Sequence, residues 1–178
     1  MNAEIEAARI VLRPVRRDDV DGPYLTWMND PEVTKYLESR FTHYTRDDLA
    51  RYVDDALRQG GVYFFAIVLK DGNRHIGNIK LGPVSREHTR GDVGIIIGEK
   101  DCWKKGYATE AVEALSRWAF AELELAKITA GAYSVNKGSV GAFERAGFKV
   151  EATLKDHYRC DGRLVDGVLM ARFPDRDV

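Results

Sequence analysis

The chain has 178 residues, of which 44% are hydrophobic and 31% charged, and its formal net charge is −1. This size predicts one domain, residues 1–178, with a full hydrophobic core, and the composition excludes a disordered chain. A nearly neutral chain argues against general nucleic-acid binding. The apolar runs are strand-sized, far short of the roughly 20 residues that span a bilayer, so no membrane association is expected.

Cysteine and histidine occur singly in the sequence. Cys102 and Cys160 lack C-x-x-C spacing, and the four histidines are scattered. This pattern predicts reduced thiols, a cytoplasmic location and no metal site. The opening residues, MNAEIEAARIVLRP, contain no apolar stretch of the kind found in signal peptides.

The first elements along the chain are expected to be a strand and two helical segments. Residues 9–15 alternate apolar and basic side chains, which is typical of a half-exposed strand. Residues 18–29 have helical spacing, but Gly22-Pro23 predicts a break or a late start. Residues 31–37 follow an Asp-Pro pair that suits a helix start, so a short helix is expected there.

The middle of the chain predicts a longer helix and three strands. Thr45 suits the N-cap of an amphipathic helix, which Gly60-Gly61 ends. Apolar runs separated by turn residues then predict the strands. These cover residues 62–69, 75–84 and 93–97.

The last third alternates helices and strands. We expect a helix over residues 106–121, a strand over 127–133, a short helix from Asn136 to Gly147 and two strands around the turn at residues 160–163. Together with the earlier elements, this order predicts an α/β fold in which a mixed sheet has helices on both faces.

Residues 93–115, VGIIIGEKDCWKKGYATEAVEAL, place a strand, a polar loop and an amphipathic helix in succession. The first N–H groups of a helix lack intrahelical partners, and the helix dipole favours an anion there. Gly106 and Ala108 leave room for phosphate oxygens, and Lys104 and Lys105 add positive charge. The spacing is neither that of a P-loop nor that of a dinucleotide fingerprint, and an ordinary helix start is the alternative interpretation.

This loop and several other segments resemble the GNAT superfamily of N-acetyltransferases. WKKGYATEA is similar to the family's acetyl-CoA pyrophosphate loop, Q/R-x-x-G-x-G/A, with Trp103, Gly106 and Ala108 at the first, fourth and sixth positions. RIVLRPVRRDD resembles the family's first strand, WMNDPEV its early substrate-side segment, NKGSVGAFERAGF its last motif and KDHYRCDGRLVDGVLMA its terminal hairpin. The combination resembles the ribosomal-protein N-terminal acetyltransferase branch, which also contains small-molecule and amino-sugar acetyltransferases. It implies a GNAT fold with a mostly antiparallel central sheet of about seven strands.

The resemblance implies acetyl-CoA as cosubstrate and no metal. The loop would hold the pyrophosphate, and the backbone at residues 95–97 would bond the pantetheine arm, which requires this strand to splay from its neighbour. A strand N–H near Ile97 would polarise the thioester. Asn136 would bond the pantetheine arm besides capping its helix. The residues expected to bind the cosubstrate are Ile95, Ile96, Ile97, Trp103, Lys104, Lys105, Gly106, Tyr107, Ala108, Thr109, Asn136, Ser139 and Phe143.

The resemblance also implies catalytic residues. Many members place a tyrosine four residues after the serine that faces the sulfur, as the acid for the departing thiolate. This chain has Phe143 there, so Ser139 is the expected substitute, directly or through a water. The expected catalytic residues are Ser139, Asn136, Tyr158 and Glu99.

The general base has more than one candidate. Some relatives place a carboxylate in the terminal hairpin where this chain has Tyr158, and the adjacent His157 is expected to face the other side of that strand. Glu99, at the mouth of the splayed strand, is another candidate. Asp92 fits a turn residue better than a base.

The acceptor side would be bordered by the early helices and the terminal hairpin. These supply Trp27, Asn29, Glu38, Arg40, His43 and Tyr158, although the helical spacing of Trp27 also fits a core position. We expect direct attack of a primary amine on acetyl-CoA, with either a small molecule such as an amino sugar or nucleotide sugar, or a protein N-terminal amine, as acceptor. A monomer or homodimer is expected. The alternative is a non-catalytic CoA-binding sensor or interaction module of the same fold.

Overall fold

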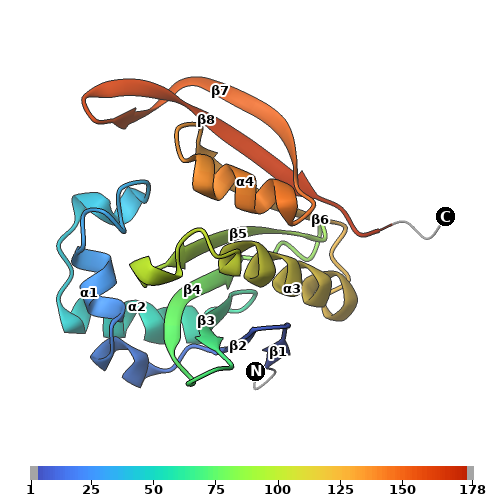
Figure 1. The fold of residues 1–178 in the computed structure, drawn as a ribbon. Helices are drawn as coiled ribbons and strands as arrows, with labels where there is room; N and C mark the ends of the chain where they lie inside the picture. Colours follow the sequence, from blue (N-terminus) through green and yellow to red (C-terminus); the bar gives the residue numbers. More distant parts are fainter. Residues whose placement is uncertain (1–3, 176–178) are drawn as a thin grey trace.

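One sheet organises the chain in the computed structural model, which describes residues 4–175 (Figure 1). Its spatial order is β1-β2-β3-β4-β5-β6-β8-β7, and the β5–β6 pair is parallel whereas the others are antiparallel. The expected mixed, mostly antiparallel sheet is confirmed, with eight strands instead of about seven. The strands are β1 (Ile5–Glu6), β2 (Ile10–Pro14), β3 (Tyr63–Leu69), β4 (His75–Leu81), β5 (Arg90–Ile97), β6 (Lys127–Tyr133), β7 (Lys149–Cys160) and β8 (Arg163–Arg172).

Helices cover both faces of the sheet, as expected. One hydrophobic core packs α3 and α4 against the strands, and a second packs α1 and α2 against the opposite face. Leu115 and Phe143 belong to the first core, and Trp27 and Val53 to the second. The helices are α1 (Tyr24–Asn29), α2 (Arg46–Arg58), α3 (Tyr107–Glu122) and α4 (Lys137–Arg145), with 3₁₀ turns η1 (Arg17–Asp21), η2 (Glu38–Phe41) and η3 (Lys100–Cys102).

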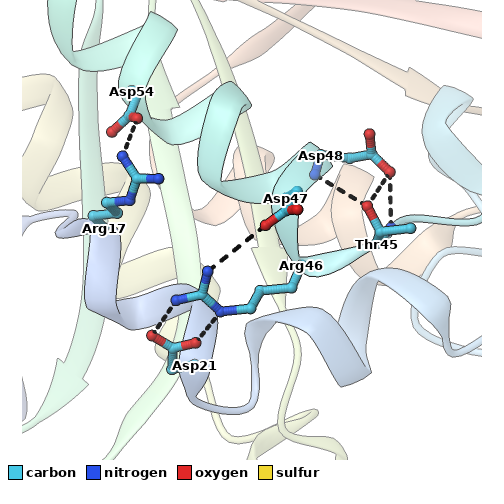
Figure 2. Close-up of polar contacts among 7 residues, drawn as sticks. All are labelled: Arg17, Asp21, Thr45, Arg46, Asp47, Asp48 and Asp54. Carbon is cyan, nitrogen blue, oxygen red and sulfur yellow. Dashed lines mark hydrogen bonds and ion pairs between the residues drawn. The ribbon is translucent and has the colours of Figure 1, made fainter.

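The start of α2 follows from a local capping box. The Thr45 hydroxyl accepts the Asp48 N–H at 3.2 Å, and the Thr45 N–H donates to the Asp48 carboxylate at 2.9 Å. Figure 2 shows this box and, further along α2, the ion pair between Arg17 and Asp54, which joins η1 to α2 at 2.6 Å. The sequence signals for this helix therefore act as expected, and the surface ion pair adds a tie to the preceding turn.

The segment between α1 and α2 departs from expectation. The break at Gly22-Pro23 is confirmed, because η1 and α1 flank it. The helix expected over residues 31–37 is wrong, since these residues form turns. The Asp30 side chain does cap the first turn, and the Thr34 N–H and hydroxyl both bond the Asp30 carbonyl at 2.9 Å, but the next backbone bond, from the Leu37 N–H to the Thr34 carbonyl at 2.8 Å, spans only three residues. Such local side-chain bonds compete with helix propagation.

The parallel pair β5–β6 is short, and this opens the sheet. The paired residues are Arg90 with Lys127, Gly91 with Ile128 and Asp92 with Thr129. Beyond this point β5 continues beside β4, whereas β6 continues beside β8. The far ends of β5 and β6 therefore have no strand partner on the sides that face each other.

Within residues 4–175, no helix is long and apolar enough to cross a membrane. The same part of the chain contains no group of three or more histidine, cysteine or acidic side chains placed to hold a metal ion. Cys102 and Cys160 are buried free thiols.

Candidate functional site

The far end of β5 presents backbone groups that β4 does not use. At the two ends of β5, the Gly98 N–H donates to β4 at 2.9 Å and the Asp92 carbonyl accepts a bond of 2.8 Å from the residue after β4. Antiparallel pairing alternates along a strand, so the even-numbered residues of β5 face β4. Ile95 and Ile97 therefore turn their N–H and carbonyl groups toward the side from which β6 has separated.

Trp103 fixes the end of this free edge. Its indole Nε1 donates to the Ile97 carbonyl at 2.7 Å. The Ile97 N–H and both polar groups of Ile95 are left facing the opening between the strands. Such an edge can pair with an amide-containing chain, and its N–H groups can stabilise a developing oxyanion.

The start of α3 lies directly after this strand and its loop. Gly106 occupies the N-cap position with φ of 85°, a conformation that favours glycine. The first intrahelical bond runs from the Glu110 N–H to the Gly106 carbonyl at 3.0 Å, so the N–H groups of Tyr107, Ala108 and Thr109 precede it without helical partners. Together with the exposed lysine pair of the loop, they form a site for an anion.

Arg9, at the entry to β2, clamps this helix start. Its backbone N–H and its Nε donate to the two Glu110 oxygens at 2.6 and 2.8 Å, and its Nη1 donates to the Lys105 carbonyl at 3.0 Å. Its guanidinium lies 4.5 Å from the centre of the Tyr107 ring. Because a trans peptide points its C=O and N–H in opposite directions, holding the Lys105 carbonyl aims the Gly106 N–H away from Arg9. Sequence reasoning missed this contact, which no local spacing signals.

Asn136 and Ser139 lie at the start of α4, which follows the separated end of β6 (Figure 1). The Asn136 Oδ1 accepts the Ser139 N–H at 3.1 Å, as an N-cap does. Phe143 differs from expectation, because it is 2% exposed and packs edge-on against Phe148 with ring centres 5.1 Å apart. Its ring thus belongs to the core and does not form a cosubstrate-binding surface.

Glu99 is held on both carboxylate oxygens. Oε1 accepts from the Trp27 indole at 2.9 Å, and Oε2 pairs with Arg74, which also binds Asp101. These contacts favour a structural role for Glu99 over that of a general base. Trp27 itself is 3% exposed, so it occupies the core position and offers no surface to an acceptor.

Asn29, another residue expected on the acceptor side, also has structural contacts. The Asn29 side chain accepts the Tyr44 N–H at 2.9 Å and donates to the Tyr44 carbonyl at 2.9 Å, which joins α1 to the segment before α2. His43 is exposed and next to this joint. Asn29 therefore has both ends of its amide engaged.

Glu38, Arg40 and Tyr158 meet around Tyr133, a residue that sequence reasoning did not select. Arg40 donates to the Tyr133 hydroxyl at 2.6 Å, and this hydroxyl donates to Glu38. The Tyr133 and Tyr158 rings stack with centres 4.0 Å apart, and Arg40 also donates to the Arg159 carbonyl at 2.8 Å. Burial raises the pKa of Tyr158, so this phenol stays protonated at neutral pH and is poorly suited to accept a proton.

His157 and Tyr158 do not face opposite sides of β7, which corrects the expectation from strand alternation. The register shifts between Leu154 and Tyr158, and Asp156 has a positive φ. The two rings lie 4.6 Å apart, and both approach Gly167. The bulge thus places both side chains together.

Asp92 lies inside β5, not in a turn as expected. It forms the last residue pair before β5 and β6 separate, and its carboxylate accepts from the Thr129 hydroxyl at 2.9 Å. Desolvation raises the pKa of this carboxyl above its ordinary value. A carboxylate whose pKa is raised therefore stands where the two strands diverge.

A cavity of about 270 Å³ lies on the α1–α2 face, against the same end of β5. Aromatic and aliphatic side chains make up most of its wall. The residues expected on the acceptor side from sequence lie elsewhere. The cavity is lined by Tyr24, Met28, Leu37, Ser39, Tyr44, Leu49, Tyr52, Phe64, Asn78, Lys80, Gly94, Ile95 and Ile96.

Known proteins resemble this chain over most of its length. The acetyltransferase (GNAT) domain family matches residues 9–149. The uncharacterized N-acetyltransferase p20 of Bacillus licheniformis is 31% identical over 160 residues, which cover 89% of each chain. Among solved structures, spermidine N-acetyltransferase from Vibrio cholerae, in complex with CoA and spermine, superposes with a TM-score of 0.82 at 22% identity, covering 93% of this chain and 95% of that one. The ribosomal-protein-S5-alanine acetyltransferase of Vibrio fischeri superposes with a TM-score of 0.79 at 19% identity, with 98% of both chains covered.

Proposed function

Because this chain belongs to the GNAT family of N-acetyltransferases, we propose that it transfers the acetyl group of acetyl-CoA to a small primary amine held in the cavity beside β5. The observation that carries this proposal is the separation of β5 from β6, which frees the backbone of Ile95 and Ile97 next to the start of α3. One end of this arrangement suits a pyrophosphate, and the other suits a thioester.

The donor fits along three parts of the chain. The N–H groups at residues 106–109, with Lys104 and Lys105, suit the pyrophosphate. The free edge at Ile95 and Ile97 suits the two amides of the pantetheine arm. Asn136 keeps its Nδ2 for the same arm while Oδ1 caps α4.

The proposed reaction is a direct transfer. The neutral amine attacks the thioester carbon, a C–N bond forms, and the carbonyl oxygen gains negative charge opposite the Ile97 N–H. The C–S bond then breaks, and the sulfur takes the bonding electron pair and accepts the proton of the Ser139 hydroxyl, directly or through a water. Solvent then returns a proton to Ser139. Asp92 is the carboxylate we assign to accept the proton that the amine loses, because its raised pKa and its place at the fork suit this step.

The cavity supports a small acceptor. Its wall comes from α1, η2, α2 and three strands, which border an open cavity of about 270 Å³ beside Gly94 and Ile95. This volume holds a ring-sized amine. A folded protein partner would have to present its N-terminus as an extended segment to reach the same place.

Free-thiol release tests the proposal. With purified protein, acetyl-CoA should bind in calorimetry, and a panel of primary amines should release CoA thiol. Ser139→Ala should lower kcat about tenfold or more without changing the Kd for CoA, whereas Ser85→Ala, in the turn before β5, should change neither. Absence of binding would refute the cosubstrate assignment. Binding without thiol release on any amine or peptide N-terminus would indicate a CoA-binding module instead.

A further inference from the structure

The cavity wall contains a buried amide without a partner. Asn78 lies on β4 opposite Ile96 of β5 and is 2% exposed. Across residues 4–175, its Nδ2 meets no hydrogen-bond acceptor. A buried polar group left unpaired costs about 1–3 kcal/mol. An amide kept in this state on a cavity wall is therefore suited to bond whatever enters the cavity.

The neighbouring histidine fixes which end of this amide faces the cavity. The His75 Nε2 lies 3.0 Å from the Gly77 carbonyl oxygen and 2.9 Å from the Asn78 Oδ1. A carbonyl only accepts, so Nε2 must carry a hydrogen and donate to both oxygens. The Asn78 oxygen is thus occupied, and its NH₂ group, buried beside the cavity, is left without an acceptor.

Lys80 adds a positive charge beside this donor. It is two residues further along β4, so it shares the face of Asn78, and within the described chain it is the charged member of the cavity wall. Its Nζ donates to the Tyr52 hydroxyl at 2.6 Å. Asp92, which Lys80 stabilises electrostatically, lies outside the wall and is bonded to Thr129. An ammonium and an amide NH₂ on the same strand face at one cavity suit a carboxylate and disfavour a second ammonium.

Gly94 leaves space for the body of such a ligand. It pairs with Lys80 across the strands, and a Cβ placed on it would meet no atom within 4 Å. Tyr24, Tyr44 and Phe64 stand on the cavity wall around this space. Aromatic walls suit an apolar or ring-shaped group.

We infer that the acceptor is a primary amine joined through a ring-sized apolar body to a carboxylate, which Asn78 and Lys80 bind. This inference rests on the proposed function and specifies its substrate class. Neighbouring strands lie about 4.8 Å apart, and the free N–H groups of β5 point away from β4. A separation of roughly 5–8 Å between the amine and the carboxylate, about the length of a para-substituted ring, would span one strand spacing and a hydrogen bond.

Three amines of one shape test the charge requirement. They are 4-(aminomethyl)benzoate, 4-methylbenzylamine and 4-(aminomethyl)benzylamine, whose far ends are anionic, neutral and cationic. The wild-type kcat/KM should fall in that order, with at least tenfold between the first and the last. Lys80→Glu should reverse this order, and Lys80→Met should make the kcat/KM values of the three amines nearly equal. An unchanged ranking in Lys80→Glu would overturn the inference, as would a wild-type preference for the diamine.

Two further variants test the amide and the space. Asn78→Leu keeps the side-chain size and removes the donor, so KM for the benzoate should rise about tenfold while KM for acetyl-CoA stays constant. Gly94→Val should raise KM for all three amines, again without affecting acetyl-CoA. Gly60→Val is the matched control, because a Cβ there also meets no atom within 4 Å but lies outside the cavity. Equal amine KM values in Gly94→Val and Gly60→Val would refute the placement.

Binding separates this inference from the proposed function. With CoA present, 4-(aminomethyl)benzoate should shift the side-chain NH₂ resonances of Asn78 in a ¹⁵N spectrum, and the diamine should not. Shifts without turnover would support the ligand class and refute the enzymatic role. Turnover of other amines without any shift at Asn78 would support the enzyme and refute the ligand class.

Discussion

Arg9→Met removes the clamp on the start of α3. In the wild-type chain Arg9 neutralises Glu110 through two bonds of 2.6 and 2.8 Å. The backbone bond survives the substitution, but the guanidinium charge is lost. An unpaired Glu110 carboxylate then stands one turn inside a helix start that should hold a pyrophosphate, so we expect weaker binding of CoA.

Coulomb's law gives the size of this effect. A carboxylate about 8 Å from a phosphate charge, at an effective dielectric constant of about 40, costs about 1 kcal/mol per charge. Two phosphate charges would double that figure. The Arg9 side chain is 50% exposed, so solvent screens part of its field. We therefore expect about 1–1.5 kcal/mol, which is a rise of about five- to tenfold in the Kd for CoA and in the KM for acetyl-CoA.

Two comparisons isolate the electrostatic part. Glu110→Gln in the Arg9→Met background should restore most of the affinity, because the unpaired charge is gone. S-acetylpantetheine lacks the pyrophosphate, so its kcat/KM should be the same in wild type and Arg9→Met. Arg17→Met, which removes an ion pair to α2 (Figure 2), is the control and should leave the Kd for CoA unchanged. An equal loss with S-acetylpantetheine, or no rescue by Glu110→Gln, would refute the reasoning.

Three other outcomes are expected. Gly98→Ala should lower the free energy of unfolding by about 1–3 kcal/mol, because its Cβ would lie 1.9 Å from Trp27; a urea midpoint equal to that of wild type would contradict this. Burial lowers the pKa of His75 below its ordinary value of 6.5. Below that pH the unfolded chain therefore binds more protons than the folded chain, and stability should fall as the pH drops through 6.5. Between pH 7.5 and pH 5.5, the free energy of unfolding of His75→Gln should fall less than that of the wild type. An identical fall in both would show that other groups cause the pH dependence. Trp103→Phe loses the hydrogen bond to the Ile97 carbonyl, so kcat should drop about tenfold with little change in the KM for the acceptor. An unaltered kcat would show that the Trp103 bond is not needed to position the free edge of β5.

Local signals account for the elements that the sequence predicted well. Thr45 and Asp48 form a capping box within four residues, and Gly106 needs a left-handed conformation at a helix start, so both boundaries are set by neighbouring residues. The strand 127–133 was predicted with the bounds that β6 has. The separation of β5 from β6 was expected from the resemblance to the GNAT family, whose pantetheine-binding strand must splay from its neighbour, and not from a local signal.

Contacts between distant segments account for what the sequence did not predict. Arg9 and Glu110 are 101 residues apart, and nothing near either one indicates the other. Asn78 lies among apolar residues in a pattern common to half-buried strands, so the sequence does not single it out. The free NH₂ group of its side chain follows only from the hydrogen that His75 Nε2 carries. The bulge in β7 reversed the expected facing of His157, because strand alternation holds only where the register is regular.

The tie between Arg40, Tyr133 and Arg159 has a mechanical consequence. Strand pairing joins the two halves of the sheet through three residue pairs at the base of the fork. At the open end, the guanidinium of Arg40 in η2 donates hydrogen bonds to Tyr133 of β6 and to Arg159 of β7. The opening between β5 and β6 is thus closed at both ends, by the strand pair at Asp92 and by the hydrogen bonds of Arg40. A ligand that widened the opening would first have to break the Arg40 bonds.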